Sequence, residues 1–517
     1  MSSTRMFVIG LDAGTFDLLE PWIKEARLPN LKRMIENSAY GQLESTIPPV
    51  TPPAWTSFMT GVNPGKHGVL DFFAFDVNSF KNILVNSSHV RSKRLWDLAG
   101  ERGKRSIILY VPMTYPPRMS QGMMISGIPA PLHGEFIYPK EMGRDLEEKL
   151  GRWWIVADGD KFMDFHEETF LSEIYQTLET RFRVASYLMT KEWDLFVWVV
   201  METDWIQHYL WEEKERCLLP FYIKIDGMIG HFMESLKKED VILIISDHGF
   251  GPISKNFYIN SWLREKGFLR SKRQRVRFQE NLDLGIAHRK KESSMMQKVK
   301  YLLVKKKLGI DWQKTQAYYH LTGWFWGIRI NLKGREPNGI VQPEEYDGVR
   351  NRIIEAMKLT VDEEEGMRVI ERICRREDIY SGPYTKDAPD IIFTLNPKYY
   401  LSDRIGNYIF KKRKVRGGFH RRDGMFILHG PGIKKGERII GPHIMDVAPT
   451  ILYLLGLPIP KGFDGKVLTG ALEPEMLKAC PIRVEDIPLD VGLPEFAMTE
   501  TEEEEIKKEL RGLGYMG

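Results

Sequence analysis

The feature that most constrains the fold of this chain is a series of short apolar runs, each followed by turn residues and then by a segment of helical length. The runs are rich in Ile and Val and lie at residues 6–11, 106–111, 195–200 and 241–246, with two later ones at 391–395 and 425–428. Strands of a parallel sheet read this way because helices bury both of its faces. Between the runs, apolar residues at helical spacing predict helices over residues 16–37, 168–190 and 220–237. The sequence therefore predicts an α/β fold.

Length and composition exclude several classes of protein. A chain of 517 residues is long enough for two or three domains, and 43% hydrophobic with 28% charged residues is ordinary for a globular protein rather than for a disordered or collagen-like one. The 74 basic and 70 acidic residues leave a net charge of only +4, which is too balanced to indicate wholesale binding to a nucleic acid duplex. Any site for a polyanion must therefore be local.

Cysteine usage and the apolar runs bear on the compartment. Cys217, Cys374 and Cys480 are odd in number, far apart and without a CxxC pair, so neither a disulfide framework nor a thiolate zinc site is indicated, and a reducing compartment fits best. The apolar run near the N-terminus is too short for a secretory signal. The other runs have about a third of the roughly 20 residues needed to cross a bilayer. We expect a cytoplasmic protein without a transmembrane segment; the sequence leaves its oligomeric state open.

Residues 270–385 differ in composition from the rest of the chain, and we expect them to form an inserted cap subdomain. Basic clusters come first: Lys272, Arg273, Arg275 and Arg277, then Arg289, Lys290 and Lys291, then Lys305, Lys306 and Lys307. They are typical of a solvated face, although they would also suit attraction of an anionic substrate or surface. An aromatic patch follows, with Tyr318, Tyr319, Trp324, Phe325 and Trp326; it suits the subdomain's own core better than a platform for stacking a base or sugar.

The remaining residues divide into a core and a tail. Residues 1–269 and 386–480 would form the catalytic core, and residues 481–517 a C-terminal tail with a helix. In that tail the acidic run 502–505 precedes Lys507 and Lys508, a pattern typical of the exposed face of a helix. The sequence indicates no catalytic or binding residues in this tail.

Polar residues stand at the ends of the first strands, where ligands gather in open α/β sheets. Asp12 follows the first run, and Gly14 suits a tight turn there. Thr51 precedes Pro52 and Pro53, which suit the first turn of a helix and would place its hydroxyl beside free backbone N–H groups. Each residue, taken alone, would equally suit a helix cap.

Three further clusters contain histidine. Asp204 and His208 stand four apart, so that one helical turn would bring both onto one face, although a plain i,i+4 pair explains them as well. Asp247 and His248 are adjacent after a strongly apolar strand, where packing alone does not account for a charge, and Gly249 would let the chain turn sharply there. His420 is expected in a glycine-bearing loop ahead of another strand. Three Asp, three His and one Thr suit two Zn²⁺ or Mn²⁺ ions rather than Ca²⁺ or Mg²⁺.

The ordered motifs FVIGLDAG, TPPAWTSFMTGVNPGKHGV, DWIQH, SDHG and GFHRRDG resemble those of the alkaline phosphatase superfamily. Within it they are most similar to the type I phosphodiesterase/nucleotide pyrophosphatase branch and the related predicted phosphohydrolases and phosphomutases. The resemblance covers about residues 6–68, 195–251 and 417–465. It implies a doubly wound, mostly parallel sheet with helices on both faces, and a metal-dependent hydrolase of phosphate mono- or diesters acting on a small phosphorylated substrate.

Carried over residue by residue, the resemblance implies two divalent metal ions, Zn²⁺ foremost and Mn²⁺ as an alternative. Asp12, Thr51, Asp247 and His248 would hold one ion, and Asp204, His208 and His420 the other. Thr51 would be the catalytic nucleophile and would carry a phospho-threonine intermediate. Chemistry agrees, because a threonine hydroxyl needs a base or a metal to act as a nucleophile at neutral pH.

Departures from the family pattern narrow this expectation. Sulfatases of the superfamily need Cys or Ser in a C/S-x-P-x-R motif, whereas here Thr51 takes that place and Trp55 replaces the arginine, so sulfatase activity is not expected. Phe72 stands where nucleotide pyrophosphatases usually have an asparagine that contacts the phosphoryl group. Two alternatives stay open: a phosphotransferase or phosphomutase using the same threonine, and a metal-containing binding protein without turnover.

Overall fold

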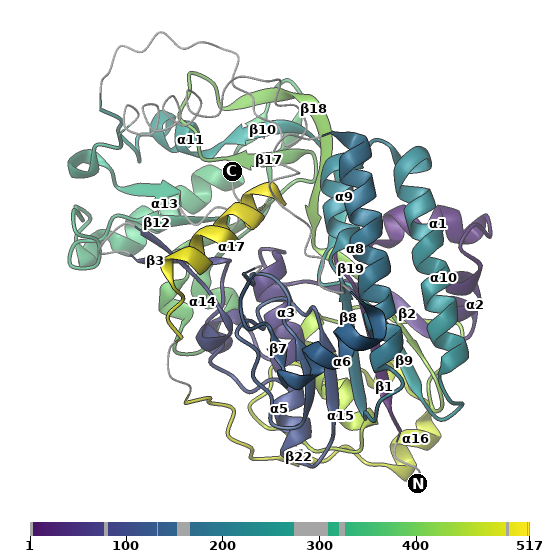
Figure 1. The fold of residues 1–517 in the computed structure, drawn as a ribbon. Coiled ribbons are helices and arrows are strands. Elements are labelled where there is room, and N and C mark those ends of the chain that lie inside the picture. The colour runs from purple at the N-terminus through teal and green to yellow at the C-terminus, as the bar shows by residue number, and fades with distance from the viewer. Residues whose placement is uncertain are drawn as a thin grey trace.

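A computed structural model describes residues 4–76, 81–131, 133–151, 166–272, 309–319, 326–492, 496–513 and 515. Its main element is a nine-stranded sheet with helices packed on both faces (Figure 1). In spatial order its strands are β20 (Glu437–Arg438), β2 (Ala39–Glu44), β19 (Asp423–His429), β9 (Val241–Ile245), β1 (Met6–Leu11), β8 (Leu195–Val200), β5 (Ser106–Leu109), β6 (Gly122–Ile125) and β7 (Ile137–Tyr138). The predicted fold class is confirmed.

The centre of this sheet is parallel and fully buried. β1 lies between β8 and β9 and pairs in parallel with both, and β8, β5 and β6 continue the parallel part. Every residue of β1, β8 and β9 is buried, which explains why these strands are continuous apolar runs rather than alternating ones. Antiparallel pairing occurs only toward the edges, where β19 joins β9 and β2, and β7 joins β6.

Two groups of helices cover the sheet (Figure 1). One contains α1 (Phe16–Lys24), α2 (Pro29–Glu36), α8 (Glu167–Leu188), α9 (Glu202–Leu210) and α10 (Leu219–Ser235), and the other contains α3 (Thr51–Thr60), α5 (Leu95–Gly100) and α15 (Val447–Leu454). The helix predicted over residues 16–37 is two helices, because Ala26 has a left-handed backbone with φ of 56° and Pro29 begins a new helix. None of the described helices has the length and apolar character needed to cross a membrane.

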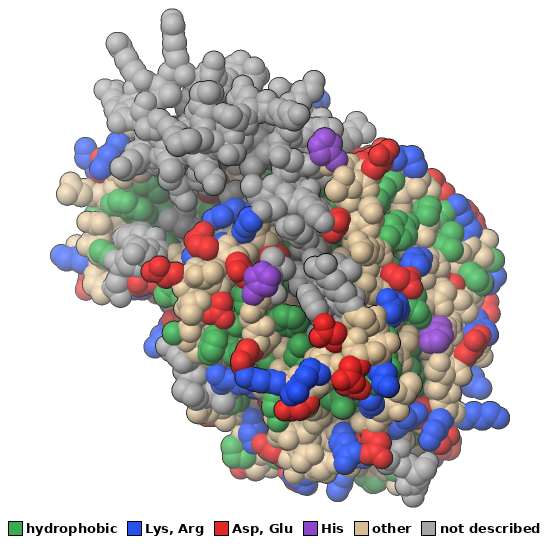
Figure 2. Space-filling view, viewed as in Figure 1, with side chains coloured by type: hydrophobic (Ala, Val, Ile, Leu, Met, Phe, Trp, Pro, Cys, Tyr) green, Lys and Arg blue, Asp and Glu red, His purple; other side chains and the backbone are tan. Residues whose placement is uncertain are grey.

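The central sheet and its helices form the larger of two lobes, which also contains three short helices. They are α4 (Pro64–His67), α6 (Glu141–Leu150) and α16 (Pro474–Ala479). Two-stranded ribbons pair β3 (Phe73–Asp76) with β4 (Lys81–Leu84), and β21 (Ile459–Pro460) with β22 (Val484–Glu485). Acidic and basic side chains are interspersed over the face shown in Figure 2, in line with the small net charge.

A smaller lobe has its own sheets and its own hydrophobic cluster. One sheet is β17 (Tyr399–Ser402), β10 (Gly249–Tyr258) and β18 (Phe410–Arg421), and the other is β11 (Ala317–Tyr319), β12 (Gly327–Ile330), β16 (Ile391–Leu395) and β15 (Ile370–Arg375). The helices α11 (Ile259–Glu265), α13 (Tyr346–Lys358) and α14 (Arg376–Ile379) and the ribbon of β13 (Val361–Asp362) and β14 (Met367–Arg368) lie in the same part of the chain.

Residues 391–395 thus form a strand, but it lies in the antiparallel sheet of the smaller lobe and not in the central sheet. Apart from Val50, the buried hydrophobic cluster of this lobe runs from Ile253 to Phe419. The boundaries of the insertion at residues 270 and 385 stay a prediction. Of its basic clusters, Lys272 is described, and residues 273–277, 289–291 and 305–307 lie outside the described residues.

The C-terminal helix α17 (Glu500–Gly512) packs on the larger lobe (Figure 1). Its acidic residues include exposed ones, as predicted, but Ile506 and Leu510 are fully buried in the main hydrophobic core. Glu509 on the same face is also buried, and burial raises its pKa to about 8, although the nearby Arg181 acts in the opposite direction. The docked helix therefore carries a carboxyl group that stays protonated near neutral pH.

We expect the free energy of unfolding to decline as the pH rises from about 4.5 to about 8, because the Glu509 carboxyl ionises in the unfolded chain well before it does in the folded one. Glu509→Gln removes this ionisation, so its stability should fall less across the same range. Urea unfolding at several pH values measures the difference, with the exposed Glu504→Gln as the control on the same helix. Equal slopes for Glu509→Gln and the wild type would contradict the prediction.

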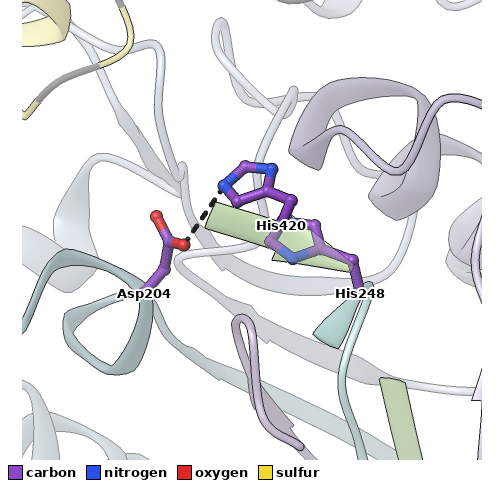
Figure 3. Close-up of side chains that lie close together, drawn as sticks. All are labelled: Asp204, His248 and His420. Carbon is purple, nitrogen blue, oxygen red and sulfur yellow. Dashed lines mark ion pairs between the residues drawn. The ribbon is translucent and has the colours of Figure 1, made fainter. Parts of the chain in front are cut away.

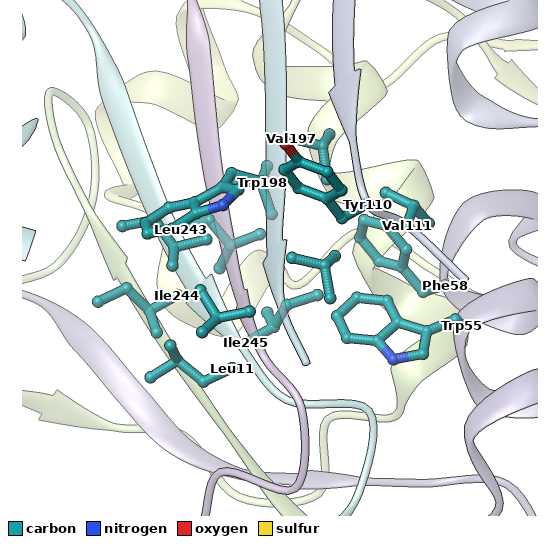
Figure 4. Close-up of a cluster of buried hydrophobic side chains, with 14 of the residues drawn as sticks. Leu11, Trp55, Phe58, Tyr110, Val111, Val197, Trp198, Leu243, Ile244 and Ile245 are labelled. Atoms are coloured by element: carbon teal, nitrogen blue, oxygen red, sulfur yellow. The ribbon is translucent and has the colours of Figure 1, made fainter. Parts of the chain in front are cut away.

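The hydrophobic core between α3 and the central strands also fixes the position of Trp55. In Figure 4, Trp55 and Phe58 of α3 lie on one side of the central strands, and Leu11 lies on the other. Trp55 passes directly over Gly10 of β1, where an added Cβ would lie 2.4 Å from the indole atom Cη2 and 2.9 Å from Val199 Cγ2. The absence of a side chain at residue 10 thus allows the indole to approach the strand.

Gly10→Ala should destabilise the protein by about 1 to 3 kcal/mol, because the added methyl group overpacks the contact with Trp55. The matched control is Gly227→Ala, at an exposed position of α10 where nothing lies within 4 Å of the added Cβ. That change should stabilise the helix by roughly 0.5 to 1 kcal/mol. Thermal and urea unfolding compare the two; no loss of stability in Gly10→Ala would refute the packing argument.

Candidate active site

The seven predicted site residues converge at one edge of the central sheet. β1, β8 and β9 are parallel neighbours, so their carboxyl ends meet there, and Asp12, Asp204 and Asp247 all follow these ends. Thr51 is the first residue of α3, His208 lies on α9, and His420 reaches the same place from β18. All seven side chains are buried, with exposed fractions of 5% or less.

Asp12, Thr51, Asp247 and His248 form the first group. Thr51 Oγ1 lies 3.2 Å from His248 Nε2, which is 3.2 Å from Asp247 Oδ2 and 3.7 Å from Asp12 Oδ1. His248 Nδ1 faces the carbonyl oxygen of Gly249 at 3.0 Å. A carbonyl only accepts hydrogen bonds, so Nδ1 carries the proton and the neutral ring directs the lone pair of Nε2 toward the carboxylates.

Asp204, His208 and His420 form the second group. Asp204 Oδ1 lies 3.3 Å from His208 Nε2 and 3.4 Å from His420 Nε2, and the two imidazole nitrogens are 3.0 Å apart. Figure 3 shows Asp204 and His420 facing each other, with His248 beside them. His420 Nδ1 lies 3.2 Å from the carbonyl of Pro49, which by the same reasoning directs Nε2 into the site.

His248 joins the two groups. Its ring stacks on that of His420 with centroids 3.8 Å apart. Suitable donor atoms of His248, Asp12 and Asp247 all lie within 4.8 Å of one another, and so do those of His248, Asp204 and His420. The two groups are therefore adjacent and share His248.

The carboxylates present oxygens that no described group satisfies. Asp12 Oδ1 and Asp247 Oδ2 are buried and receive no hydrogen bond of acceptable geometry. The other oxygens are held by the protein: Trp55 Nε1 donates to Asp12 Oδ2 at 2.8 Å, and the backbone N–H of Ala13 donates to Asp247 Oδ1 at 3.3 Å. Buried carboxylate oxygens without donors are costly unless a cation balances them, so this donor set fits divalent metal ions.

The pKa shifts of the three carboxyl groups also indicate a site for cations. Burial raises the pKa of Asp12 well above its usual range, and the charges of Asp247 and Asp204 raise it further. Burial likewise raises the pKa of Asp247, aided by Asp204. Burial alone would raise the pKa of Asp204, but His208 and His420 outweigh it and hold that pKa well below the usual value. Without added positive charge, three carboxylates cannot all ionise here.

Burial also lowers the pKa of His248 well below its ordinary value, and that of His420 in the same direction. Burial thus favours loss of the proton from these rings, and neutral histidine is the state that binds metal ions.

The structure corrects three local expectations. His420 lies in strand β18, opposite Phe250 of β10, and not in a loop. The turn after β1 takes its left-handed conformation at Ala13, with φ of 59°, and not at Gly14. Gly249 allows close packing rather than a sharp turn, since a Cβ there would lie 2.1 Å from the carbonyl oxygen of Asp423.

The start of α3 offers fewer backbone donors than expected. Pro52 and Pro53 occupy its first turn, and proline has no N–H, so Thr51 is the one residue among the three that keeps an amide donor. The hydroxyl of Thr51 does not cap the helix; Val50 is the cap residue, and the hydroxyl faces His248. This arrangement leaves Thr51 available for chemistry.

Two residues that contact the site were missed from the sequence as participants. From the sequence, Trp55 is only a departure from the sulfatase motif, yet its indole donates a hydrogen bond to Asp12. Tyr515 follows α17, and its hydroxyl donates to Asp204 Oδ2 at 2.6 Å. The spacing of Trp55, one helical turn after Thr51, was a signal for its role; nothing in the sequence connects residue 515 to residue 204.

The predicted aromatic patch is partly described. Tyr318, Tyr319 and Trp326 are buried in the hydrophobic cluster of the smaller lobe, which favours the interpretation as core. Trp324 and Phe325 lie outside the described residues. Trp326 stacks on Phe419, which stacks on His420, so this core also supports the ring of one site residue.

The chain matches the family model of type I phosphodiesterase / nucleotide pyrophosphatase over residues 6–423. Among solved structures it is similar to phosphonoacetate hydrolase from Sinorhizobium meliloti 1021, with 14% identity, coverage of 87% of this chain and 95% of that one, and a TM-score of 0.53. Human ectonucleotide pyrophosphatase / phosphodiesterase 5 gives 13% identity, coverage of 88% and 95%, and a TM-score of 0.49. No curated protein matches the sequence.

The family match defines the class of protein as a hydrolase of phosphoric esters in the alkaline phosphatase superfamily. Within that class the chain belongs to the type I phosphodiesterase / nucleotide pyrophosphatase family.

Asp247→Asn should lower the metal content of the purified protein from about two ions toward one per chain, because a neutral amide balances a divalent cation poorly. Elemental analysis after dialysis measures it. The matched control is Asp145→Asn, whose partly exposed carboxylate contacts Lys191 and Tyr187, neither of which is a site residue. Unchanged metal content in Asp247→Asn would remove Asp247 from the ligand set.

Proposed function

We propose that this protein cleaves phosphate mono- or diesters at a two-metal site through a phospho-threonine intermediate on Thr51. The observation that carries the proposal is the position of the Thr51 hydroxyl, 3.2 Å from His248 Nε2. His248 itself lies close to Asp12 and Asp247 on one side and to Asp204 and His420 on the other. A hydroxyl beside two prospective cations is placed to act as an oxygen nucleophile.

Asp12, Asp247, His248 and Thr51 would hold one divalent ion, and Asp204, His208 and His420 the other. When bound, such ions act as Lewis acids toward phosphoryl oxygens and lower the pKa of a coordinated hydroxyl or water. Mixed imidazole and carboxylate donors favour Zn²⁺, with Mn²⁺ as an alternative.

In the first step Thr51 Oγ1 loses its proton and attacks phosphorus; the new Oγ1–P bond forms as the ester P–O bond breaks, and the alcohol leaves with a proton. In the second step water attacks the same phosphorus, the Oγ1–P bond breaks, and Thr51 regains its proton. The backbone amide of Thr51, the first residue of α3, would support negative charge on the phosphoryl oxygens.

The protein's own contribution is to fix these groups and to exclude water. Trp55 and the Ala13 amide each hold one carboxylate oxygen, so that the other oxygen of each side chain points to the site. The rings of Phe250 and Phe419 lie 4.9 and 6.1 Å from the ring of His208 and form an apolar wall. A low dielectric strengthens each electrostatic contact with the transition state.

Thr51→Ala should reduce turnover by at least about a thousandfold, since no other described hydroxyl occupies its position. Metal content should change little, because six of the seven proposed ligands remain. Thr51→Ser keeps a hydroxyl at the same atom and should retain part of the activity. Full activity in Thr51→Ala would remove this residue from the nucleophilic role.

The assay compares p-nitrophenyl phosphate with bis-p-nitrophenyl phosphate, each with Zn²⁺ or Mn²⁺ added to metal-free protein. Trapping of ³²P or of mass-shifted peptide at Thr51 in a quenched reaction tests the covalent intermediate directly. Products analysed with and without added alcohols separate hydrolysis from transfer to a hydroxyl. Absence of turnover of both esters with either metal would contradict the proposed function.

A further inference from the structure

We infer that Tyr515 is a positioning residue of the active site, which its hydroxyl reaches because the C-terminal helix docks on the catalytic lobe. The inference deepens the proposed function and rests on it, since it assigns a partner to one of the proposed metal ligands. Nothing in the sequence motifs of the site extends to this part of the chain.

The central contact is a short hydrogen bond between two buried side chains. The Tyr515 hydroxyl donates to Asp204 Oδ2 at 2.6 Å, and the exposed fractions are 2% for Tyr515 and zero for Asp204. The other oxygen of the same carboxylate, Oδ1, faces His208 and His420. Tyr515 thus occupies one oxygen of Asp204 and leaves the second directed toward the neighbouring imidazoles.

Such a hydrogen bond prevents the carboxylate group from rotating. A carboxylate with one free oxygen can swing about its terminal bond, whereas a donor on the far oxygen holds the near one in place for coordination. Trp55 and the Ala13 amide do the same for Asp12 and Asp247. With Tyr515 included, each of the three carboxylates has one oxygen held by the protein and one directed to the site.

The ring of Tyr515 packs against two aromatic neighbours, Phe72 and the site residue His208. Its centroid lies 5.0 Å from that of Phe72 and 6.2 Å from that of His208. Phe72 is the residue that departs from the asparagine pattern of nucleotide pyrophosphatases, and it is fully buried here. The departure has a structural consequence in this chain, because a benzyl side chain at residue 72 supplies the surface on which Tyr515 packs.

Several contacts anchor the segment that carries Tyr515. The Tyr209 hydroxyl, on the same helix as Asp204 and His208, donates to the carbonyl of Gly512. Tyr115 donates to Glu502 at 2.7 Å near the start of α17, and Leu513 is fully buried in the main core. The contacts at both ends of α17 thus hold the segment that carries Tyr515 against α9.

The test uses Tyr515→Phe, which keeps the ring and removes only the hydroxyl. Its control is Tyr115→Phe, which removes a hydroxyl bonded to the same helix without touching Asp204. Both proteins, and the wild type, are stripped of metal and titrated with Zn²⁺ in a competing chelator, and with Co²⁺ while the ligand-field absorption is followed.

We expect Tyr515→Phe to bind one of two ions about 10- to 100-fold more weakly, with an altered Co²⁺ spectrum, while Tyr115→Phe binds both as the wild type does. With metal saturating, kcat should fall in Tyr515→Phe while KM stays close to that of the wild type. Unfolding curves establish that all three proteins are folded.

Equal affinities and equal Co²⁺ spectra in Tyr515→Phe and the wild type would overturn the inference and leave the proposed function standing. Equal losses in both variants would also overturn it, because docking of α17 and not the hydroxyl on Asp204 would then be responsible. A wild-type protein that binds no divalent ion would overturn the proposed function itself, a result that the titration separates from the other two.

Discussion

The structure depends on the cost of placing three carboxylates together in a buried position. Asp12, Asp204 and Asp247 follow three adjacent parallel strands, so the topology of the sheet brings them to one point whether or not their charges are balanced. Their mutual repulsion and burial raise the pKa of two of them. A site of this kind is stable in its ionised form only with added positive charge, and this requirement links the fold to metal-dependent chemistry.

The protein reduces that cost by holding each carboxylate from one side. Trp55, the Ala13 amide and Tyr515 come from three separate parts of the chain, and each donates to one oxygen. Because the donors are fixed by packing, the remaining oxygens point inward, toward the imidazole rings of the site. The apolar core beneath α3 is thus part of the active site, since it sets the position of the Trp55 indole over β1.

The smaller lobe contributes to the same geometry. β10 begins directly after His248 and pairs with β18, which brings His420 to the other site residues. Trp326 and Phe419 continue the stack of rings behind His420. A lobe with its own hydrophobic cluster therefore holds one of the proposed ligands, so that movement between the lobes would change the site.

Much of this protein was determined by local sequence. Continuous apolar runs identify the central strands, because burial on both faces excludes polar residues. Asp12, Asp204 and Asp247 follow three of these runs, so their place at the strand ends could be predicted from the sequence. A spacing of four placed His208 beside Asp204. The tertiary structure alone decided the rest: that residues 391–395 belong to a second sheet, that His420 lies on a strand, and that Tyr515 reaches Asp204 from about 300 residues away. Periodicity reports only which face of an element is buried, whereas a partner distant in the chain is selected by packing, which no local pattern contains.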